Sequence, residues 1–212
     1  RFSAEQNAAV VAEAERYYRA MVQSSSESWN VRDVHMVDTL DRLLGQAGEK
    51  AVLWEHNTHI GDARATDMAA AGMVNVGQLL RERHGRQDVV LVGFGGYRGA
   101  VIAGDEWGAQ MRRMPVPAAR NGSLEAFLQA ILGEDALIVV PHGDRPEWLD
   151  RRLDHRAIGV VYRPERERWG NYVPTVVGRR YDAFLYLEDT SPLQPLHLER
   201  AEEHVPLLAH AV

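Results

Sequence analysis

Two histidines and two carboxylates lie close together in residues 54–62, which read WEHNTHIGD. The histidines are His56 and His59, and Glu55 and Asp62 lie beside them. A histidine exchanges protons near neutral pH, and a nearby carboxylate can orient its ring and support its charged form. These residue types at this spacing predict acid–base chemistry. In the alternative interpretation, one histidine caps a loop and the other is exposed.

The same histidines could instead bind a metal ion, since zinc accepts two histidines and a carboxylate as ligands. Asp62 and Asp67 follow them as candidate third ligands. The helical H-E-x-x-H pattern is absent, because Asn57 stands at its second place. We expect no metal here, and a metal-dependent hydrolase stays open as an alternative.

A glycine-rich run at residues 93–99, GFGGYRG, follows a predicted strand. A dinucleotide site needs the spacing G-x-G-x-x-G and then a helix. Here the spacing is G-x-G-x-x-x-G, and the next residues look like a strand. We therefore expect no nucleotide cofactor, and we interpret the glycines as a turn or as backbone clearance beside a pocket. Ser123 lacks a G-x-S-x-G context and is expected to cap a helix.

The composition excludes several classes of function. The net charge of −6 gives no electrostatic support for nucleic-acid binding. The absence of cysteine excludes disulfides, thiol nucleophiles and Cys-zinc sites. No apolar run approaches the roughly 18 residues that a membrane span needs. A helical pattern begins almost at residue 1 without an initiator Met, so we expect a chain that starts partway through a larger protein.

Helical and strand patterns alternate along the chain, which predicts one α/β domain over residues 1–212. We expect a mostly parallel open sheet flanked by helices, with the histidines just past the end of its first strand. The serines at 24–26 should end the first helix, and Pro115 and Pro117 should mark a loop. Helices are predicted at residues 3–22, 31–44, 75–84 and 123–132, and strands at 51–54, 88–94, 99–103, 136–140, 157–162 and 181–187.

Residues in the first turn of the second predicted helix could also reach the histidines. Asp33 there suits the helix dipole. Arg32 or His35 could project into the same cleft as His56, although a purely structural role is the simpler interpretation.

Three segments together resemble the erythromycin esterase family. They are residues 17–21 (YYRAM), 29–36 (WNVRDVHM) and 54–61 (WEHNTHIG), of which the W-x-H-N-x-H signature is the most specific. Residues 75–80, 156–162 and 180–184 are similar to later family segments, so the likeness runs from residue 8 to 197. The nearest branch is an uncharacterised bacterial one.

This resemblance implies hydrolysis of an ester by a histidine-activated water, without a covalent intermediate. His56 matches the C-terminal histidine of the family. The family's N-terminal G-E-x-x-H-G motif, with its general-base histidine, does not occur here. The chain would then be the C-terminal part of the catalytic domain, with an incomplete active site and the missing N-terminal half as its partner.

From the resemblance we assign a set of candidate site residues. We also expect a cytoplasmic protein with an unknown small-molecule ester as substrate, no nucleic-acid or membrane partner, no cofactor, and self-association of the isolated domain. A non-catalytic ligand-binding domain is the remaining alternative. The predicted catalytic residues are His56, Glu55 and His59, and the predicted substrate-binding residues are Asn57, Arg64 and Trp107.

Overall fold

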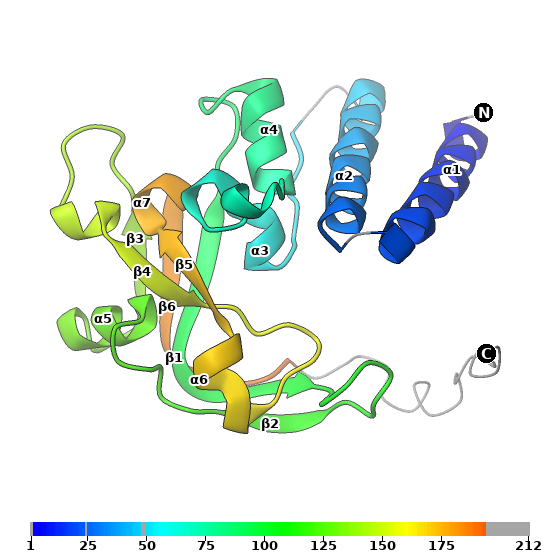
Figure 1. Ribbon diagram of the computed structural model, residues 1–212. Coiled ribbons are helices and arrows are strands. Elements are labelled where there is room, and N and C mark those ends of the chain that lie inside the picture. The colour runs from blue at the N-terminus through cyan, green and yellow to red at the C-terminus, as the bar shows by residue number, and fades with distance from the viewer. Residues whose placement is uncertain (1, 24, 48–49, 194–212) are drawn as a thin grey trace.

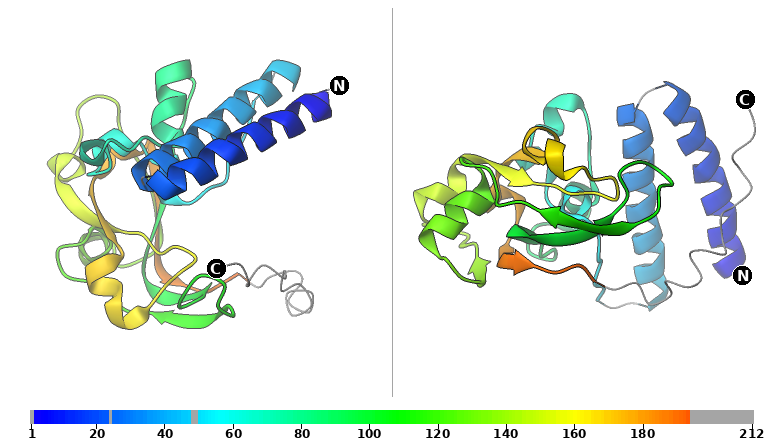
Figure 2. Two further views of the ribbon diagram at one scale, coloured as in Figure 1. Left: turned by 45° about the vertical axis from the view of Figure 1, so that its right-hand side comes forward. Right: turned by 90° about the horizontal axis from the view of Figure 1, so that it is seen from below.

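The computed structural model describes residues 2–23, 25–47 and 50–193. It opens with two long helices, α1 (Phe2–Gln23) and α2 (Ser25–Ala47), which lie side by side on one flank of the molecule (Figures 1 and 2). Both predicted helices are confirmed, but α2 already begins at Ser25, so the serine run does not separate them as widely as expected. None of the helices in these ranges is long and apolar enough to cross a membrane.

The main sheet has four strands in the order β2-β1-β6-β3. Its long strand β1 (Val92–Ala103) pairs in parallel with β6 (Ala183–Thr190). The outer strands β2 (Arg112–Val116) and β3 (Ala136–Val139) are both antiparallel to their neighbours. The expectation of a mostly parallel sheet is therefore wrong. β2 follows β1 through residues 104–111, which are too few for the crossover that a parallel pair needs.

The glycine-rich run lies inside β1 and forms no turn, so the two strands predicted at 88–94 and 99–103 are one. Gly99 shows why glycine is needed, since its φ is +136°. A Cβ there would lie 2.1 Å from the carbonyl oxygen of Thr190. The glycine thus permits a backbone conformation and a close approach between β1 and β6 that a side chain would prevent.

Two further expectations about strands are wrong. Residues 51–54 belong to no helix or strand, and Val52 and Trp54 are 93% and 80% exposed. Residues 157–162 form only an isolated bridge between Gly104 and Val161. A separate antiparallel pair, β4 (Arg152–Arg156) with β5 (Tyr172–Val176), was not predicted. An apolar run indicates burial or β-propensity, but a strand also needs a partner beside it.

Local capping signals placed two helices correctly. Asn75 caps α4 (Val76–His84), and Gly85 ends that helix with a φ of +84°. Ser123 caps α5 (Leu124–Ile131) by accepting the Ala126 N–H at 3.2 Å, as expected. The remaining short helices are α3 (Asn57–Ile60), η1 (Ala63–Ala65), η2 (Ala69–Ala71), η3 (Glu147–Asp150), η4 (Pro164–Arg166), α6 (Glu167–Gly170) and α7 (Val177–Arg180).

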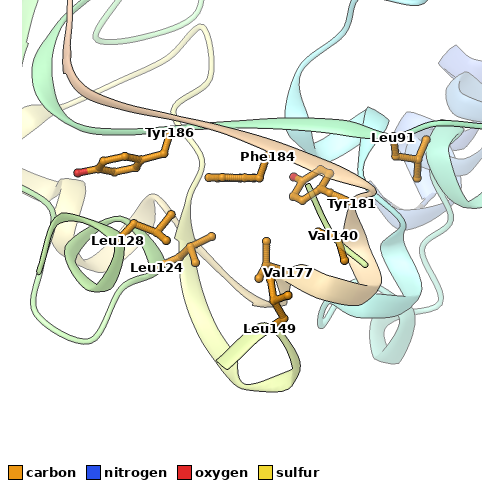
Figure 3. Packing of buried hydrophobic residues seen from close by; sticks show 9 residues of the cluster. All are labelled: Leu91, Leu124, Leu128, Val140, Leu149, Val177, Tyr181, Phe184 and Tyr186. Carbon is orange, nitrogen blue, oxygen red and sulfur yellow. The ribbon is translucent and has the colours of Figure 1, made fainter. Parts of the chain in front are cut away.

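Two apolar clusters hold the histidine segment in place. The larger one packs α5, α7 and β6 together, and its buried residues are Leu91, Leu124, Leu128, Val140, Leu149, Val177, Tyr181, Phe184 and Tyr186 (Figure 3). The smaller cluster joins α2 to α4 through Val37, Val76 and Leu80. Ile60, at the end of α3, packs against both. The short helix that follows His56 is thus clamped between the helices and the sheet (Figure 1).

Candidate active site

Side-chain hydrogen bonds from two residues fix the N-terminal end of helix α3. His56 is its N-cap, and the ring nitrogen Nδ1 accepts the Thr58 N–H at 3.3 Å. Asn57 reaches across to β1, where its amide accepts from the Phe94 N–H at 3.1 Å and donates to the Phe94 carbonyl at 2.5 Å. Because the carbonyl and NH₂ groups of the Asn57 side chain both bond to β1, α3 has a defined position against the sheet.

His59 lies on the other side of α3, among residues of α2. Its Nδ1 is 2.9 and 3.0 Å from the two oxygens of the buried Asp33 carboxylate. Its Nε2 is 3.1 Å from Nη2 of Arg32. The ring stacks on Trp29 with centroids 4.4 Å apart and planes 2° apart. Arg32 therefore contacts His59 and does not line the cavity beside His56, contrary to the functional alternative for this residue.

These contacts fix the tautomer of His59. A guanidinium can only donate, so Nε2 must accept from Arg32. Nδ1 then carries the proton and donates it to Asp33, which also accepts the Val76 N–H at 3.2 Å. An imidazole that donates from one nitrogen to a carboxylate and accepts at the other has the arrangement that orients a catalytic base.

Glu55 lies beside this group. Burial raises the pKa of its carboxyl; His59 and Arg32 lower it and Asp33 raises it, with a net upward shift. One oxygen, Oε2, is buried and has no hydrogen-bond partner in the part of the chain that the structure describes. An upward shift of the pKa favours the neutral carboxyl more than in an exposed glutamate, which is the direction that a proton donor needs.

His56 faces a different environment. Its Nε2 is 2.9 Å from the Ile158 carbonyl, so Nε2 carries the proton, and Nδ1 is 2.9 Å from the Thr58 hydroxyl. The residue is exposed at the rim of a cavity, yet the surrounding protein removes enough water from the ring to lower its pKa. Both nitrogens are thus occupied, and the capping role that the sequence left open for one histidine is confirmed.

A second carboxylate–histidine pair lies behind Asn57 and was not predicted. His155 and Glu125 are both fully buried, with Nδ1 and Oε1 2.6 Å apart. Nε2 of His155 is 3.3 Å from Nδ2 of Asn57. Burial lowers the pKa of His155 more than Glu125 raises it. Glu125 lies in the first turn of a helix and His155 in an unpredicted strand, so no local pattern joined these residues, which are 30 positions apart.

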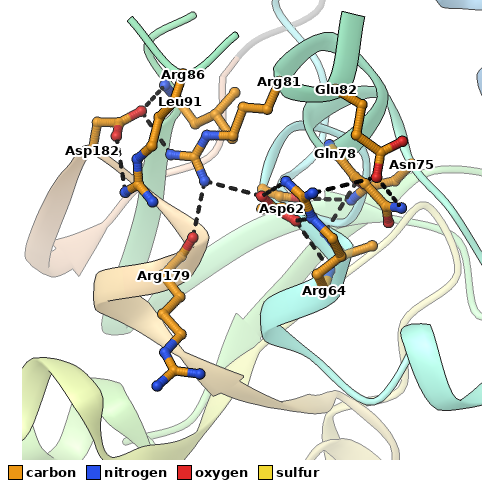
Figure 4. A network of polar contacts seen from close by, with 12 residues as sticks. Asp62, Arg64, Asn75, Gln78, Arg81, Glu82, Arg86, Leu91, Arg179 and Asp182 are labelled. Carbon is orange, nitrogen blue, oxygen red and sulfur yellow. Dashed lines mark hydrogen bonds and ion pairs between the residues drawn. The ribbon is translucent and has the colours of Figure 1, made fainter.

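The predicted substrate-binding residues are dispersed. Arg64 pairs with Asp62 at 2.8 Å and with Glu82 at 3.3 Å, in a network that continues through Arg81 to Asp182 (Figure 4). Trp107 is 83% exposed in the turn between β1 and β2. Of the three, only Asn57 lines the cavity beside His56.

The candidate metal ligands are not gathered at one point. Among the described residues, no three His, Asp or Glu side chains are placed to hold a metal ion together. His59 is engaged by Asp33 and Arg32, and His56 by Thr58 and Ile158. Each histidine nitrogen that could bind a metal is therefore hydrogen-bonded to another group of the protein.

Solved structures with a similar fold include three larger proteins. A succinoglycan biosynthesis protein matches with a TM-score of 0.64 and 18% identity, over 80% of this chain and 40% of that one. A protein from Bacillus cereus matches with a TM-score of 0.65 and 17% identity, over the same shares. A histidine-to-asparagine mutant of the erythromycin esterase EreC, in its open conformation, matches with a TM-score of 0.57 and 19% identity, over 84% and 42%.

These likenesses show the fold, and the chain spans about two fifths of the length of each of these proteins. The family itself is shown by the sequence. The profile of the erythromycin esterase family matches residues 1–190, which include α2, α3 and both histidine groups. The chain therefore belongs to the erythromycin esterase family.

Proposed function

We propose that this chain carries part of the active site of an erythromycin-esterase-like hydrolase, in which a histidine activates water to cleave an ester. The observation that carries the proposal is the environment of His59. Asp33 holds Nδ1–H, and Nε2 is left as an acceptor beside Arg32. Family membership and the likeness to EreC support an esterase-type activity.

In the proposed reaction, the ester carbonyl displaces the contact between Arg32 and His59. Water adds to the carbonyl carbon while its proton passes to Nε2 of His59. The guanidinium of Arg32 stabilises the negative oxygen of the tetrahedral intermediate. The ester C–O bond then breaks, and the alcohol leaves with the proton that His59 took from the water, or with a proton from Glu55 that His59 then replaces. Either route returns both residues to their starting state and leaves the carboxylic acid as the second product.

We assign different roles to the two histidines. Both ring nitrogens of His56 are bonded within the protein, so we propose that it fixes α3 and borders the substrate. Asn57 ties α3 to β1 and contributes to the same positioning. If a second histidine acts as the base, the Arg32 guanidinium would polarise the ester carbonyl, and His59 would position that guanidinium through the contact at Nε2.

The test is hydrolysis of 4-nitrophenyl butyrate by the natural protein that contains this sequence. We expect His59→Gln to lower kcat by about 10²–10⁴-fold, the usual contribution of general acid–base catalysis, with little change in KM. His56→Gln should lower kcat less. His142→Gln, at an exposed residue outside the site, is the matched control. Full kcat in His59→Gln, or no ester hydrolysis by the unaltered protein, contradicts the proposal.

A further inference from the structure

A cavity of about 430 Å³ runs along β1, with His56 at its rim. This volume is within the range of small-molecule sites. Most of the side chains around it are apolar, and they come from β1, β2 and the segments after β4 and β6. The apolar lining includes Phe94, Ala100, Val101, Ile102, Val116 and Ile158.

Arg156 is the one residue with a permanent positive charge among those lining the cavity, and all its N–H groups are already used. Nε donates to Glu167 at 2.6 Å. Nη1 donates to the carbonyls of Gly96 and Tyr97 at 3.0 and 2.9 Å. Nη2 donates to the carbonyl of Pro117 at 2.9 Å and to the Tyr172 hydroxyl at 3.1 Å. A guanidinium has five N–H bonds, so none remains for an anion.

The other polar groups at the cavity are likewise engaged. His56 donates from Nε2 to the Ile158 carbonyl, and its lowered pKa favours the neutral ring. Asn57 uses its amide on Phe94 and His155. The Thr190 hydroxyl donates to the carbonyl of Arg98 at 3.1 Å. Ser191 adds only an exposed neutral hydroxyl.

We propose that this cavity binds the neutral, apolar part of a small molecule and rejects anionic groups, although an arginine and a histidine line it. On the proposed function, which this inference extends, the occupant is the apolar acyl or alkyl portion of the ester. Burial of each methylene of that portion against the apolar lining favours binding. A carboxylate placed here would lose part of its water and find no free charged donor among the described lining residues, which is costly.

The test compares 1-octanol with octanoate at pH 8, because they share a chain length and differ in charge. Each is titrated into the ¹⁵N-labelled 212-residue chain, and backbone amide shifts are followed. We expect octanol to shift the amides of Gly95, Gly96 and Val101 in a saturable way. Octanoate should bind the same amides at least about tenfold more weakly, which corresponds to about 1.4 kcal/mol.

A cavity-filling variant separates this site from non-specific apolar binding. Ala100 is buried and lines the cavity, so Ala100→Leu should abolish the octanol shifts. Ala136→Leu, in the edge strand β3 outside the cavity, is the matched control and should leave them unchanged. The circular dichroism of both variants reports whether they fold.

Several outcomes overturn the inference. These are octanoate binding as tightly as octanol, no saturable octanol shift at these amides, and octanol shifts that survive in folded Ala100→Leu. The outcome is independent of catalysis. If the ester is hydrolysed but octanol does not bind, this inference fails and the proposed function stands. If octanol binds and His59→Gln keeps full kcat, this inference stands and the proposed function fails.

Discussion

Replacing Asp33 with asparagine tests the histidine site without requiring activity. The Asp33 carboxylate is fully buried and accepts from His59 Nδ1–H and from the Val76 N–H. The two acceptor contacts to Nδ1, at 2.9 and 3.0 Å, mean that either orientation of an asparagine amide places its NH₂ group close to that nitrogen. A switch of the ring to the other tautomer would turn Nε2–H toward the Arg32 guanidinium. With either tautomer of His59, one N–H group therefore faces another: the asparagine NH₂ faces Nδ1–H, or the Arg32 guanidinium faces Nε2–H.

The expected loss of stability follows from this unpaired buried donor. A buried donor left without its acceptor costs about 1–3 kcal/mol. We expect Asp33→Asn to lower the free energy of unfolding by that amount. Asp38→Asn on the same helix is the control, since the ion pair of Asp38 with Arg83, at 2.7 Å, is partly exposed. Exposed pairs contribute roughly 0.2–1 kcal/mol, so the control should lose less.

Two measurements check this expectation. Urea denaturation gives the free energies of unfolding for the two variants and the unaltered chain. Two-bond ¹H–¹⁵N spectra of the histidine rings give the tautomer of His59, which should be protonated at Nδ1 in the unaltered chain and disturbed in Asp33→Asn. A His59 ring protonated at Nε2 in the unaltered chain refutes the reasoning. So does a stability loss in Asp33→Asn no larger than that of Asp38→Asn.

Three further results are expected. Arg81→Met should cost about 3–5 kcal/mol in urea denaturation, because the buried Arg81 pairs with Asp62 and Asp182, while the half-exposed Arg64→Met should cost less than about 1 kcal/mol. Burial raises the pKa of Asp62, but hydrogen bonds from Arg64 and Arg81 outweigh this and lower it overall. Its stabilising contribution is therefore present above the ordinary carboxyl pKa and lost as the pH falls through the folded value, so a penalty for Arg81→Met that stays constant into acid would contradict this pairing. Residues 1–212 alone should hydrolyse activated esters negligibly and contain no stoichiometric zinc after purification without added metal. Robust turnover in a steady-state assay, or zinc found by elemental analysis and lost in His59→Ala, would contradict these two expectations.

Local signals in the sequence were enough for several helices. Asn75 and Ser123 were identified as caps, because a short polar side chain before an amphipathic run can accept a free N–H of the first turn. Gly85 was identified as a helix end, because it adopts a positive φ at little cost. At residues 93–99 the expected turn is wrong, because the glycines lie in a strand that approaches its neighbour closely. The alternative of backbone clearance beside a pocket agrees with Gly95 and Gly96, which line the cavity.

The candidate site was predicted only in part. The segment that carries Glu55, His56 and His59 was found from its residue types and its family signature. The resemblance favoured His56 as the catalytic histidine, whereas we propose that role for His59. The reason is the local structure, because α3 turns His59 toward α2 and leaves His56 at the cavity along β1.

The sequence by itself determined the family, the residue types available for chemistry, and the helices whose ends are capped locally. Only the tertiary structure decided which groups meet. Asp33 lies 26 positions before His59, and Glu125 lies 30 before His155, so their contacts depend on the packing of α2, α4, α5 and β4. The parallel pairing of β1 with β6 was decided in the same way, because Val92 pairs with Ala183, far away in the sequence. Hydrogen bonds and burial depend on which groups are close in space. Local sequence patterns show only which groups are close along the chain.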